Sequence, residues 1–283
     1  MVSKNVSWGS SFFFLLSMVC LLVPAVSFGQ VNVKPKNDWN VGIALYSFHR
    51  HSLPEALKLA KEAGVKNIEG FSFYNLGPAY GNKSWDNLSA DEVVKVKQLI
   101  QENGLQMTSV YVGGGQTEQE WKHNFEFGKA YGVKYLVCEP SVEVLPLIDS
   151  LAGLYGIKIA IHQHAKGSSY FWHPEVFLKA TKGFKNIGAC ADVGHWVRSG
   201  VDPVAAIKSL KGHIIGIHLK DVDADGRDVD FGKGKVGVPA LLKELKKQKY
   251  TGYIQMECEQ NFDDNIKDVK KMLSDFNALT KSK

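Results

Sequence analysis

The sequence predicts an α/β fold, a single (β/α)8 TIM barrel, and three observations support this prediction. Short β-rich runs alternate with amphipathic helical stretches from Val41 to the C-terminus, and this alternation implies parallel strands joined by crossover helices. Eight such runs can be counted, and about 250 residues is the usual size of this barrel. The first run leads into Tyr46-Ser-Phe-His-Arg-His, which is not the glycine-rich phosphate loop of the alternative fold, an open doubly wound sheet.

Local signals place the elements along the chain. The first helix is expected to follow Ser52 as its N-cap, with Pro54 and Glu55 in its first turn, and to end at Gly64. Further helices are expected over residues 90–103 and 118–131, and strands over residues 41–46, 66–71, 106–112, 133–138, 157–161, 187–191, 213–219 and 253–256. Residues 221–236, rich in Asp and Gly, are expected to form a long loop after the seventh strand.

Residues 1–29 have the layout of a secretory signal peptide. Lys4 precedes a long apolar run over residues 12–26, and small residues then stand at the −3 and −1 positions of a cleavage before Gln30. An uncleaved membrane anchor is the alternative, but the run is short for a span of about 20 residues. We therefore expect an exported protein, periplasmic or secreted, with no stable membrane insertion after cleavage and one barrel domain over residues 30–283.

Charge and cysteine usage exclude two classes of protein. The formal net charge is +5, and the basic residues are scattered over amphipathic stretches, as on solvated helix faces and not on a nucleic-acid-binding patch. Cys138, Cys190 and Cys258 remain after the expected cleavage, and an odd number does not indicate a disulfide framework. Each lies in or beside an apolar run, where a buried thiol is expected, although direct metal ligation by a thiolate stays open.

Metal-competent or titratable side chains stand at the ends of most predicted strands. In a (β/α)8 barrel these carboxyl ends meet on one face, which carries the active site. Residues two apart in a strand share a face, so both members of His162-Gln-His164 are able to point inward. The side chains concerned are Glu69, Glu139, His162, His164, Asp192, His195, His218, Lys220, Asp221, Glu257 and Glu259.

This mixture of carboxylates and imidazoles predicts a divalent metal ion. Oxygen and nitrogen ligands together suit Mn²⁺, Co²⁺, Zn²⁺ or Fe²⁺, with Mg²⁺ as a further candidate, better than they suit an all-oxygen Ca²⁺ site. A cation also explains why acidic side chains would be gathered in one place, since it offsets their repulsion.

Three motifs resemble the xylose-isomerase-like barrel superfamily, which contains sugar isomerases and epimerases and the endonuclease IV-type enzymes. They are Asp192-Val-Gly-His195, then His218-Leu-Lys-Asp221, and Glu257 on the last predicted strand. The resemblance covers nearly the whole chain after residue 29 and implies that Asp192, His218 and Glu257 are metal ligands. The family usually has a glutamate at the end of the fifth strand, where this chain has His162; Glu139, one strand earlier, is able to supply the missing carboxylate.

These observations give a complete set of candidate site residues. The predicted metal ligands are Glu139, His162, Asp192, His218 and Glu257. The predicted catalytic residues are Glu139 and Glu257 as acids or bases, His164 and His195 as bases, and Lys220 as a partner for a developing oxyanion. The predicted substrate contacts are Glu69, Trp172 and Trp196, the two tryptophans as apolar walls for a sugar ring.

The predicted function is a metal-dependent isomerase or epimerase that acts through an enediolate on a free sugar or sugar derivative. Export argues against a phosphorylated substrate. The main alternative is a lyase or hydrolase of oxidised (keto) glycosides, which would use the same enediolate with a leaving group. An abasic-site endonuclease and a non-catalytic sugar-binding barrel are further alternatives. The expected partner is a small-molecule carbohydrate and not a nucleic acid, and the sequence leaves a homo-oligomer open.

Overall fold

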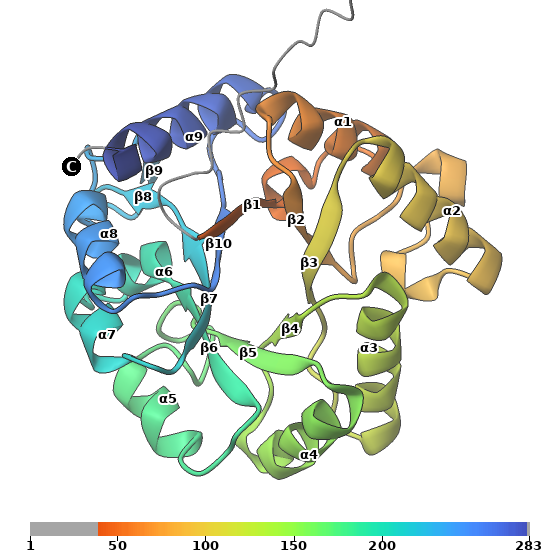
Figure 1. Ribbon diagram of the computed structural model, residues 1–283, viewed down its shortest axis with the longest axis horizontal. Helices are drawn as coiled ribbons and strands as arrows, with labels where there is room; N and C mark the ends of the chain where they lie inside the picture. Colours follow the sequence, from red (N-terminus) through yellow and green to blue (C-terminus); the bar gives the residue numbers. More distant parts are fainter. Residues whose placement is uncertain (1–38, 282–283) are drawn as a thin grey trace, which may run out of the picture. The chain divides into compact units, whose positions relative to one another are not determined.

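Eight parallel strands close into a barrel in the computed structural model, which describes residues 39–281 (Figure 1). Neighbouring strands follow the order β1-β10-β7-β6-β5-β4-β3-β2, so that β1 and β2 close the ring. The strands are β1 Asn40–Ala44, β2 Asn67–Phe71, β3 Gln106–Tyr111, β4 Tyr135–Cys138, β5 Lys158–His162, β6 Ile187–Asp192, β7 Ile214–Leu219 and β10 Tyr253–Met256. The predicted (β/α)8 barrel and all eight predicted strands are therefore confirmed, while the predicted signal peptide lies outside the described residues.

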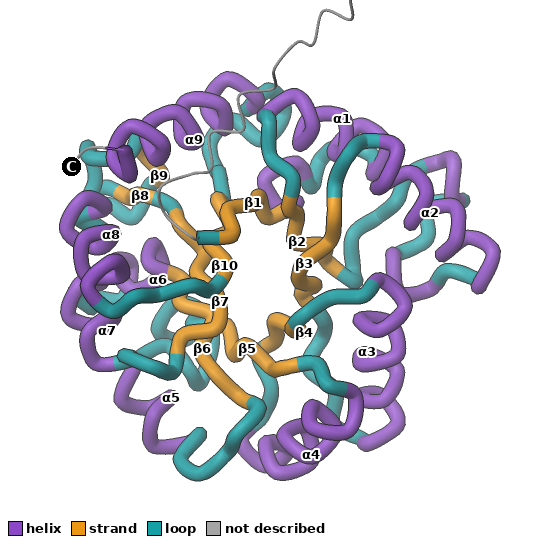
Figure 2. The backbone as a smooth tube through the Cα atoms, in the orientation of Figure 1, coloured by secondary structure: helices purple, strands orange, loops and turns teal. Residues whose placement is uncertain are grey.

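The α-helices form a ring around the strands (Figure 2). They are α1 Leu53–Ala63, α2 Ala90–Glu102, α3 Glu118–Tyr131, α4 Leu145–Tyr155, α5 Pro174–Ala180, α6 Val193–Arg198, α7 Pro203–Ser209, α8 Val238–Lys247 and α9 Ile266–Lys281. Short 3-10 helices cover Leu45–Phe48, Pro78–Tyr80, Trp85–Asn87 and Val142–Val144.

Capping side chains explain where the first helices begin and end. The backbone N–H of Ser89 donates to Glu92 at 2.8 Å, and that of Thr117 donates to Glu120 at 2.8 Å, as in capping boxes. Gly64 ends α1 in the left-handed conformation, with a φ of 84°, which costs a glycine little. The helix boundaries predicted from the sequence are confirmed here within a residue or two.

The predicted loop over residues 221–236 contains more structure than its polar composition suggested. Strands β8 Asp221–Val222 and β9 Asp228–Val229 pair in an antiparallel hairpin. The Asp221 carboxylate is almost fully buried and accepts the backbone N–H groups of Val222, Gly232, Gly234 and Val236. One buried acid thus organises the segment that was predicted as a long loop, and the polar composition did not show that this acid would be buried.

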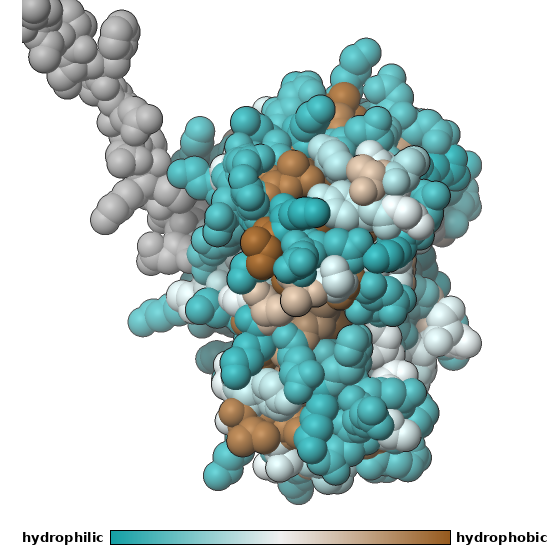
Figure 3. All heavy atoms as spheres, turned by 90° about the vertical axis from the view of Figure 1, so that its right-hand side faces the viewer, coloured by the Kyte–Doolittle hydropathy of each residue, from teal (hydrophilic) through white to brown (hydrophobic). Residues whose placement is uncertain are grey.

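The surface and the helices of the described residues bear on membrane insertion. The face over α2 and α3 is mostly hydrophilic, with small separate hydrophobic areas (Figure 3). Within residues 39–281 no helix is long and apolar enough to cross a membrane. Cys138, Cys190 and Cys258 are free and buried, as expected for thiols in apolar runs.

Candidate functional site

Three ligand-competent atoms meet where β5, β6 and β7 end. They are His162 Nε2, Asp192 Oδ2 and His218 Nδ1, all within 4.8 Å of one another. Asp192 Oδ2 lies 3.4 Å from His162 Nε2 and 3.8 Å from His218 Nδ1. The strand register explains the meeting, because Asp192 stands directly beside His218 across β6 and β7.

The residues present fit a divalent metal ion. All three atoms are buried, and none has a hydrogen-bond partner among the described residues. Leaving a buried polar atom without a partner costs about 1–3 kcal/mol, and three such atoms facing one another are rare without a shared ligand. Two imidazoles and a carboxylate form a donor set that suits Zn²⁺, Mn²⁺, Co²⁺ or Fe²⁺.

Two carboxylates orient the imidazoles toward this centre. His218 Nε2 lies 2.7 Å from Glu69 Oε1, and His162 Nδ1 lies 3.1 Å from Glu139 Oε1. The carboxylates thus engage His218 Nε2 and His162 Nδ1. The other nitrogen of each ring, His218 Nδ1 and His162 Nε2, faces the centre and is able to bind a metal, as in carboxylate–histidine–metal arrangements. Glu69 was predicted to contact the substrate; its side chain is fully buried and also accepts from Ser109 Oγ at 2.7 Å, so it supports His218 instead.

Glu139 was predicted as a metal ligand, and the structure places it behind His162. Its Oε1 also accepts the Tyr111 hydroxyl. Burial raises the pKa of Glu139, but His162 and Tyr111 outweigh this and lower the pKa to about 2. The side chain keeps 26% of its surface exposed and reaches the central cavity, so Glu139 is a charged group in reach of a substrate.

Glu257 and Lys220 adjoin the three-atom centre. Glu257 Oε2 lies 3.5 Å from His218 Nδ1, at the edge of the cluster that the resemblance implied. The Lys220 ammonium lies 3.1 Å from Asp192 Oδ2, 2.5 Å from Glu257 Oε2 and 2.6 Å from Glu259 Oε1. Burial lowers the pKa of Lys220, but Asp192, Glu257 and Glu259 raise it well above the ordinary value, so this lysine is charged.

The predicted oxyanion role of Lys220 does not agree with this geometry. Its side chain is fully buried and does not line the cavity. Three carboxylates surround its ammonium, which is the arrangement that makes a buried charge tolerable. Lys220 therefore neutralises the acidic cluster and holds Asp192 and Glu257 in place.

Arg198 connects this cluster to the hairpin after β7. Its guanidinium contacts Asp228 at 2.7 Å and Glu259 at 3.2 Å, and it donates to the Gly226 carbonyl at 2.8 Å. Asp228 also accepts the backbone N–H of Glu259 at 3.0 Å. The polar segment 221–236 is thus fastened to the site by charged groups.

A cavity of about 340 Å³ opens above the centre, at the carboxyl ends of the strands. Its lining divides by strand into two groups. Titratable side chains come from β4, β5, β6, β7 and β10, and aromatic side chains come from the ends of β10, β1, β2 and β3. The first group is Glu139, His162, His164, His195, His218, Glu257 and Glu259, and the second is Tyr46, Phe71, Phe73, Tyr111 and Phe262.

His164 and His195 lie side by side in the titratable half, with ring centroids 3.9 Å apart. Burial lowers the pKa of both imidazoles, that of His195 to about 3. Both predicted bases therefore line the cavity as neutral imidazoles. The backbone N–H of His195 donates to Asp192 Oδ1 at 2.8 Å, which caps α6 and leaves Oδ2 for the centre.

The two predicted tryptophan walls are not part of this cavity. Trp196 is fully buried in the core on α6. Trp172 lines a separate cavity of about 390 Å³ beside α5 and α7. Trp172 lies in the loop after β5 and Trp196 on α6 after β6, so both follow strands that carry metal-competent residues. Their side chains nevertheless lie away from the central cavity.

Six lining residues were not among the predicted site residues. They are Glu259 and the five aromatic residues Tyr46, Phe71, Phe73, Tyr111 and Phe262. A usable signal was present, because each stands at or just after the end of a strand, where side chains reach the carboxyl face of a barrel.

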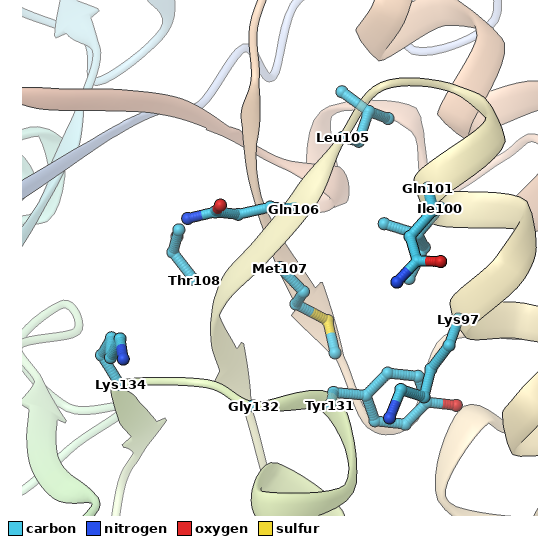
Figure 4. Close-up of a pocket in the computed structure, with 10 residues that line it drawn as sticks. All are labelled: Lys97, Ile100, Gln101, Leu105, Gln106, Met107, Thr108, Tyr131, Gly132 and Lys134. Atoms are coloured by element: carbon cyan, nitrogen blue, oxygen red, sulfur yellow. The ribbon is translucent and has the colours of Figure 1, made fainter.

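A second hollow lies at the opposite end of β3, between α2 and the end of α3 (Figure 4). It measures about 270 Å³ and is lined by residues such as Gln106, which begins β3, and Lys134, which precedes β4. None of its described lining residues is an acid, a histidine or a cysteine, so it lacks the side chains that usually bind a divalent metal ion.

Comparison with known proteins places this architecture in a family. The family described as "Xylose isomerase-like TIM barrel" matches residues 57–276. A solved structure of an uncharacterized protein from Parabacteroides distasonis is 33% identical, with a TM-score of 0.69 over 84% of this chain and 97% of that one.

Two proteins with assigned names share shorter segments. The rhizopine catabolism protein MocC of Rhizobium meliloti is 30% identical over 125 residues, or 38% of each chain. The inosose dehydratase of Clostridium beijerinckii is 28% identical over 133 residues, which cover 40% of this chain and 44% of that protein. The chain thus matches less than half the length of either relative.

Proposed function

Since the chain belongs to the xylose isomerase-like TIM barrel family, we propose that it is a divalent-metal-dependent isomerase or epimerase of an unphosphorylated sugar or sugar derivative. The family comprises sugar-processing barrels, and a small carbohydrate is the substrate that fits it. The metal dependence rests on three buried ligand atoms that lack hydrogen-bond partners among the described residues, and the reaction type rests on the placement of two carboxylates.

The observation that carries the reaction type is the position of Glu139 and Glu257 around the barrel. Glu139 follows β4 and Glu257 follows β10, which stand on opposite sides of the closed ring, and both line the cavity. In the described residues, the hydrogen bonds and ion pairs of Glu139 engage Oε1, and those of Glu257 engage Oε2. A sugar between them would meet a proton-transferring group on each face.

The chain's own groups then have distinct tasks. A bound divalent cation would polarise the substrate oxygens next to the reacting carbon. One carboxylate removes the proton from the carbon beside the carbonyl and becomes a carboxylic acid. The carboxyl group on the opposite side enters the step protonated, gives its proton to the other face of that carbon, which inverts it, and becomes a carboxylate. His162, Asp192 and His218 would hold the cation, while Glu69 keeps His218 oriented and Lys220 limits repulsion among the acids.

Hydrogen exchange in D₂O tests this proposal. Metal-loaded protein is incubated with a panel of aldoses and ketoses, and ¹H NMR follows deuterium incorporation beside the carbonyl together with formation of the isomer or epimer. Glu139→Gln is expected to lower the exchange rate by roughly 10²–10⁴-fold, the usual contribution of a general acid or base. Absence of exchange for every sugar with fully loaded wild-type protein would argue against the isomerase or epimerase.

Elimination is the second candidate, because a relative matched over part of its length is named as a dehydratase. In this case the base removes the proton, the bond from the neighbouring carbon to its oxygen breaks, and a proton passes to the leaving oxygen. Incubation with keto-glycosides separates the two reactions. Release of the aglycone supports elimination, whereas inversion or carbonyl migration without release supports the isomerase or epimerase.

Removal of metal tests the proposal against a non-catalytic sugar-binding barrel. If the cation binds only the folded state, saturation at about 100 times its Kd stabilises the fold by about 2.7 kcal/mol. Treatment with a chelator should therefore lower the Tm, and Mn²⁺, Co²⁺ or Zn²⁺ should restore it. A Tm that ignores chelator and metal alike would favour the binding barrel.

We also propose export of the protein, on the basis of the apolar run and small residues before Gln30. N-terminal sequencing of the protein from its native cells is expected to begin at Gln30. Recovery of the chain with its first 29 residues in the cytoplasm would contradict export.

A further inference from the structure

The aromatic half of the cavity has no task in the proposed reaction. We infer that this aromatic shelf, formed by Tyr46, Phe71, Phe73, Tyr111 and Phe262, binds an apolar substituent of an uncharged sugar. The substrate class is then an oxidised (keto) glycoside with an aryl or similarly apolar aglycone, because its keto group supplies the carbonyl that the proposed reaction needs, while unoxidised glycosides serve as binding probes. This inference rests on the proposed function only for the position of the sugar, which lies at the metal centre.

The shelf is one continuous surface and not a set of separate rings. Its members lie at the end of, or in the segment that follows, β10, β1, β2 and β3, which are consecutive neighbours in the barrel. Ring centroids lie 5.6 Å apart for Tyr46 and Phe71 and 5.5 Å apart for Phe71 and Tyr111, the second pair stacked at 14°. Phe73 lies 5.6 Å from Phe71, and Phe262 lies 6.1 Å from Tyr46.

Exposure increases along the shelf from the centre to solvent. Phe71 is 3% exposed, whereas Phe73 is 54% exposed and is one of four large hydrophobic residues that stand out from the surface of the described chain. A half-exposed phenylalanine adds little to a core, but its free face offers apolar area to a ligand. Tyr111 joins the shelf to the polar half, because its hydroxyl donates to Glu139.

The charges around the cavity favour an uncharged ligand. Among the described lining residues there is no Lys or Arg, while Glu139, Glu257 and Glu259 are present. A phosphate group would therefore meet carboxylates without the guanidinium or ammonium that normally binds it.

The cations nearest to the cavity are already paired. Carboxylates surround Lys220, and Asp228 and Glu259 hold Arg198. Arg50 lies 5.6 Å from the Phe262 ring, but its guanidinium contacts Asp263 at 2.9 Å. The cavity volume of about 340 Å³ falls within the range of small-molecule sites, about 300–1,000 Å³.

Matched glycosides test the inference by binding alone. Isothermal titration of the Mn²⁺-loaded protein compares phenyl and methyl glycosides of glucose, galactose and xylose, together with glucose 6-phosphate. For at least one sugar the phenyl glycoside is expected to bind about tenfold more tightly than its methyl partner, the effect of burying part of an aromatic ring. Glucose 6-phosphate is expected to bind no more tightly than glucose.

Two variants locate the effect. Phe73→Ala should reduce the phenyl-to-methyl preference to about threefold or less, because it removes the exposed ring face that the phenyl group would cover. Tyr170→Ala is the matched control, because Tyr170 is 58% exposed and does not line the cavity, and the preference should persist in this variant. A melting curve verifies folding, and Phe262→Ala serves in place of Phe73→Ala if that variant does not fold.

The outcomes separate this inference from the proposed function. Three results would overturn the inference, even in a protein that binds metal and catalyses exchange. They are equal affinities for phenyl and methyl glycosides, no binding of any phenyl glycoside, and tighter binding of glucose 6-phosphate than of glucose. A phenyl preference that depends on Phe73 supports the inference, even in a protein that shows no exchange with any sugar.

Discussion

The two ends of the barrel are built from the same strands but differ in the state of their buried polar groups. At the carboxyl end, three ligand atoms without hydrogen-bond partners among the described residues face one another, and a buried lysine forms ion pairs with three carboxylates, one of them Asp192. At the amino end of β3, the hollow of Figure 4 is lined by apolar, amide and lysine side chains, with no acid or histidine among the described residues. Burying polar atoms and charges lowers the stability of a fold. The difference therefore indicates that the carboxyl end, where such groups are concentrated, is the candidate site.

Asp192→Asn is expected to have the largest effect on the carboxyl end. Asparagine keeps an oxygen that is able to cap α6 but loses the charge that faces the metal, so metal affinity should fall well beyond the roughly 10–100-fold loss seen for outer-shell changes. Metal content after dialysis and hydrogen exchange in D₂O measure the effect. Asp202→Asn, which alters the N-cap of α7, is the matched control, and retention of metal by Asp192→Asn at the wild-type level would show that the centre is elsewhere.

Lys220→Met should destabilise the metal-free protein by about 3–5 kcal/mol, because its removal leaves three carboxylates without their buried cation. Urea unfolding in the presence of a chelator measures this free energy. Lys247→Met, at a side chain that is 78% exposed, should change it by less than about 0.5 kcal/mol. Equal stability of the two variants would mean that Lys220 is not needed to offset the acidic cluster.

Glu69→Gln removes the charge that orients His218, while the size of the side chain is preserved. Metal affinity is expected to fall by about 10–100-fold, with a smaller change in unfolding free energy than for Lys220→Met. Competition with a chromogenic chelator measures the affinity. Glu62→Gln, on the exposed face of α1, provides the comparison, and the same affinity in both variants would remove Glu69 from the metal-supporting role.

Lys97→Ala is expected to have the smallest effect, and it tests the amino end of the barrel, which lacks the proposed metal centre. Lys97 lines the hollow at the amino end of β3, and surface substitutions of this kind change stability by less than about 0.5 kcal/mol. Metal affinity and hydrogen exchange should match the wild type. A marked loss of either would show that the two ends are coupled.

The sequence predicted the fold closely and the site in part. Alternating runs predicted all eight barrel strands, because the periods of strands and helices are local properties of the chain. His162, Asp192 and His218 were among five predicted metal ligands, of which the family resemblance implied Asp192, His218 and Glu257, and the structure brings His162, Asp192 and His218 together. This meeting was predictable because successive side chains of a strand point to opposite faces, and no other information on side-chain direction was needed.

Roles that depend on side-chain direction were harder to predict. Glu69 was expected to touch the substrate and Lys220 an oxyanion, yet both are fully buried and contact protein groups. Trp196 was expected at the cavity and lies in the core, while Phe73 and Phe262 reach the cavity without having been predicted. Sequence position located these residues at the carboxyl end but did not show which of them face the cavity.

The sequence by itself therefore predicted the barrel and five candidate metal ligands at the carboxyl ends of its strands, and the structure brings ligand atoms of three of these, His162, Asp192 and His218, together. Tertiary structure alone decided that Glu69 and Glu139 support imidazoles, that Lys220 neutralises the acids, and that aromatic rings occupy half of the cavity. The physical reason is that secondary structure follows from short-range periodicity, whereas hydrogen-bond partners such as Glu69 and His218 are 149 residues apart in the sequence and meet only when the barrel closes.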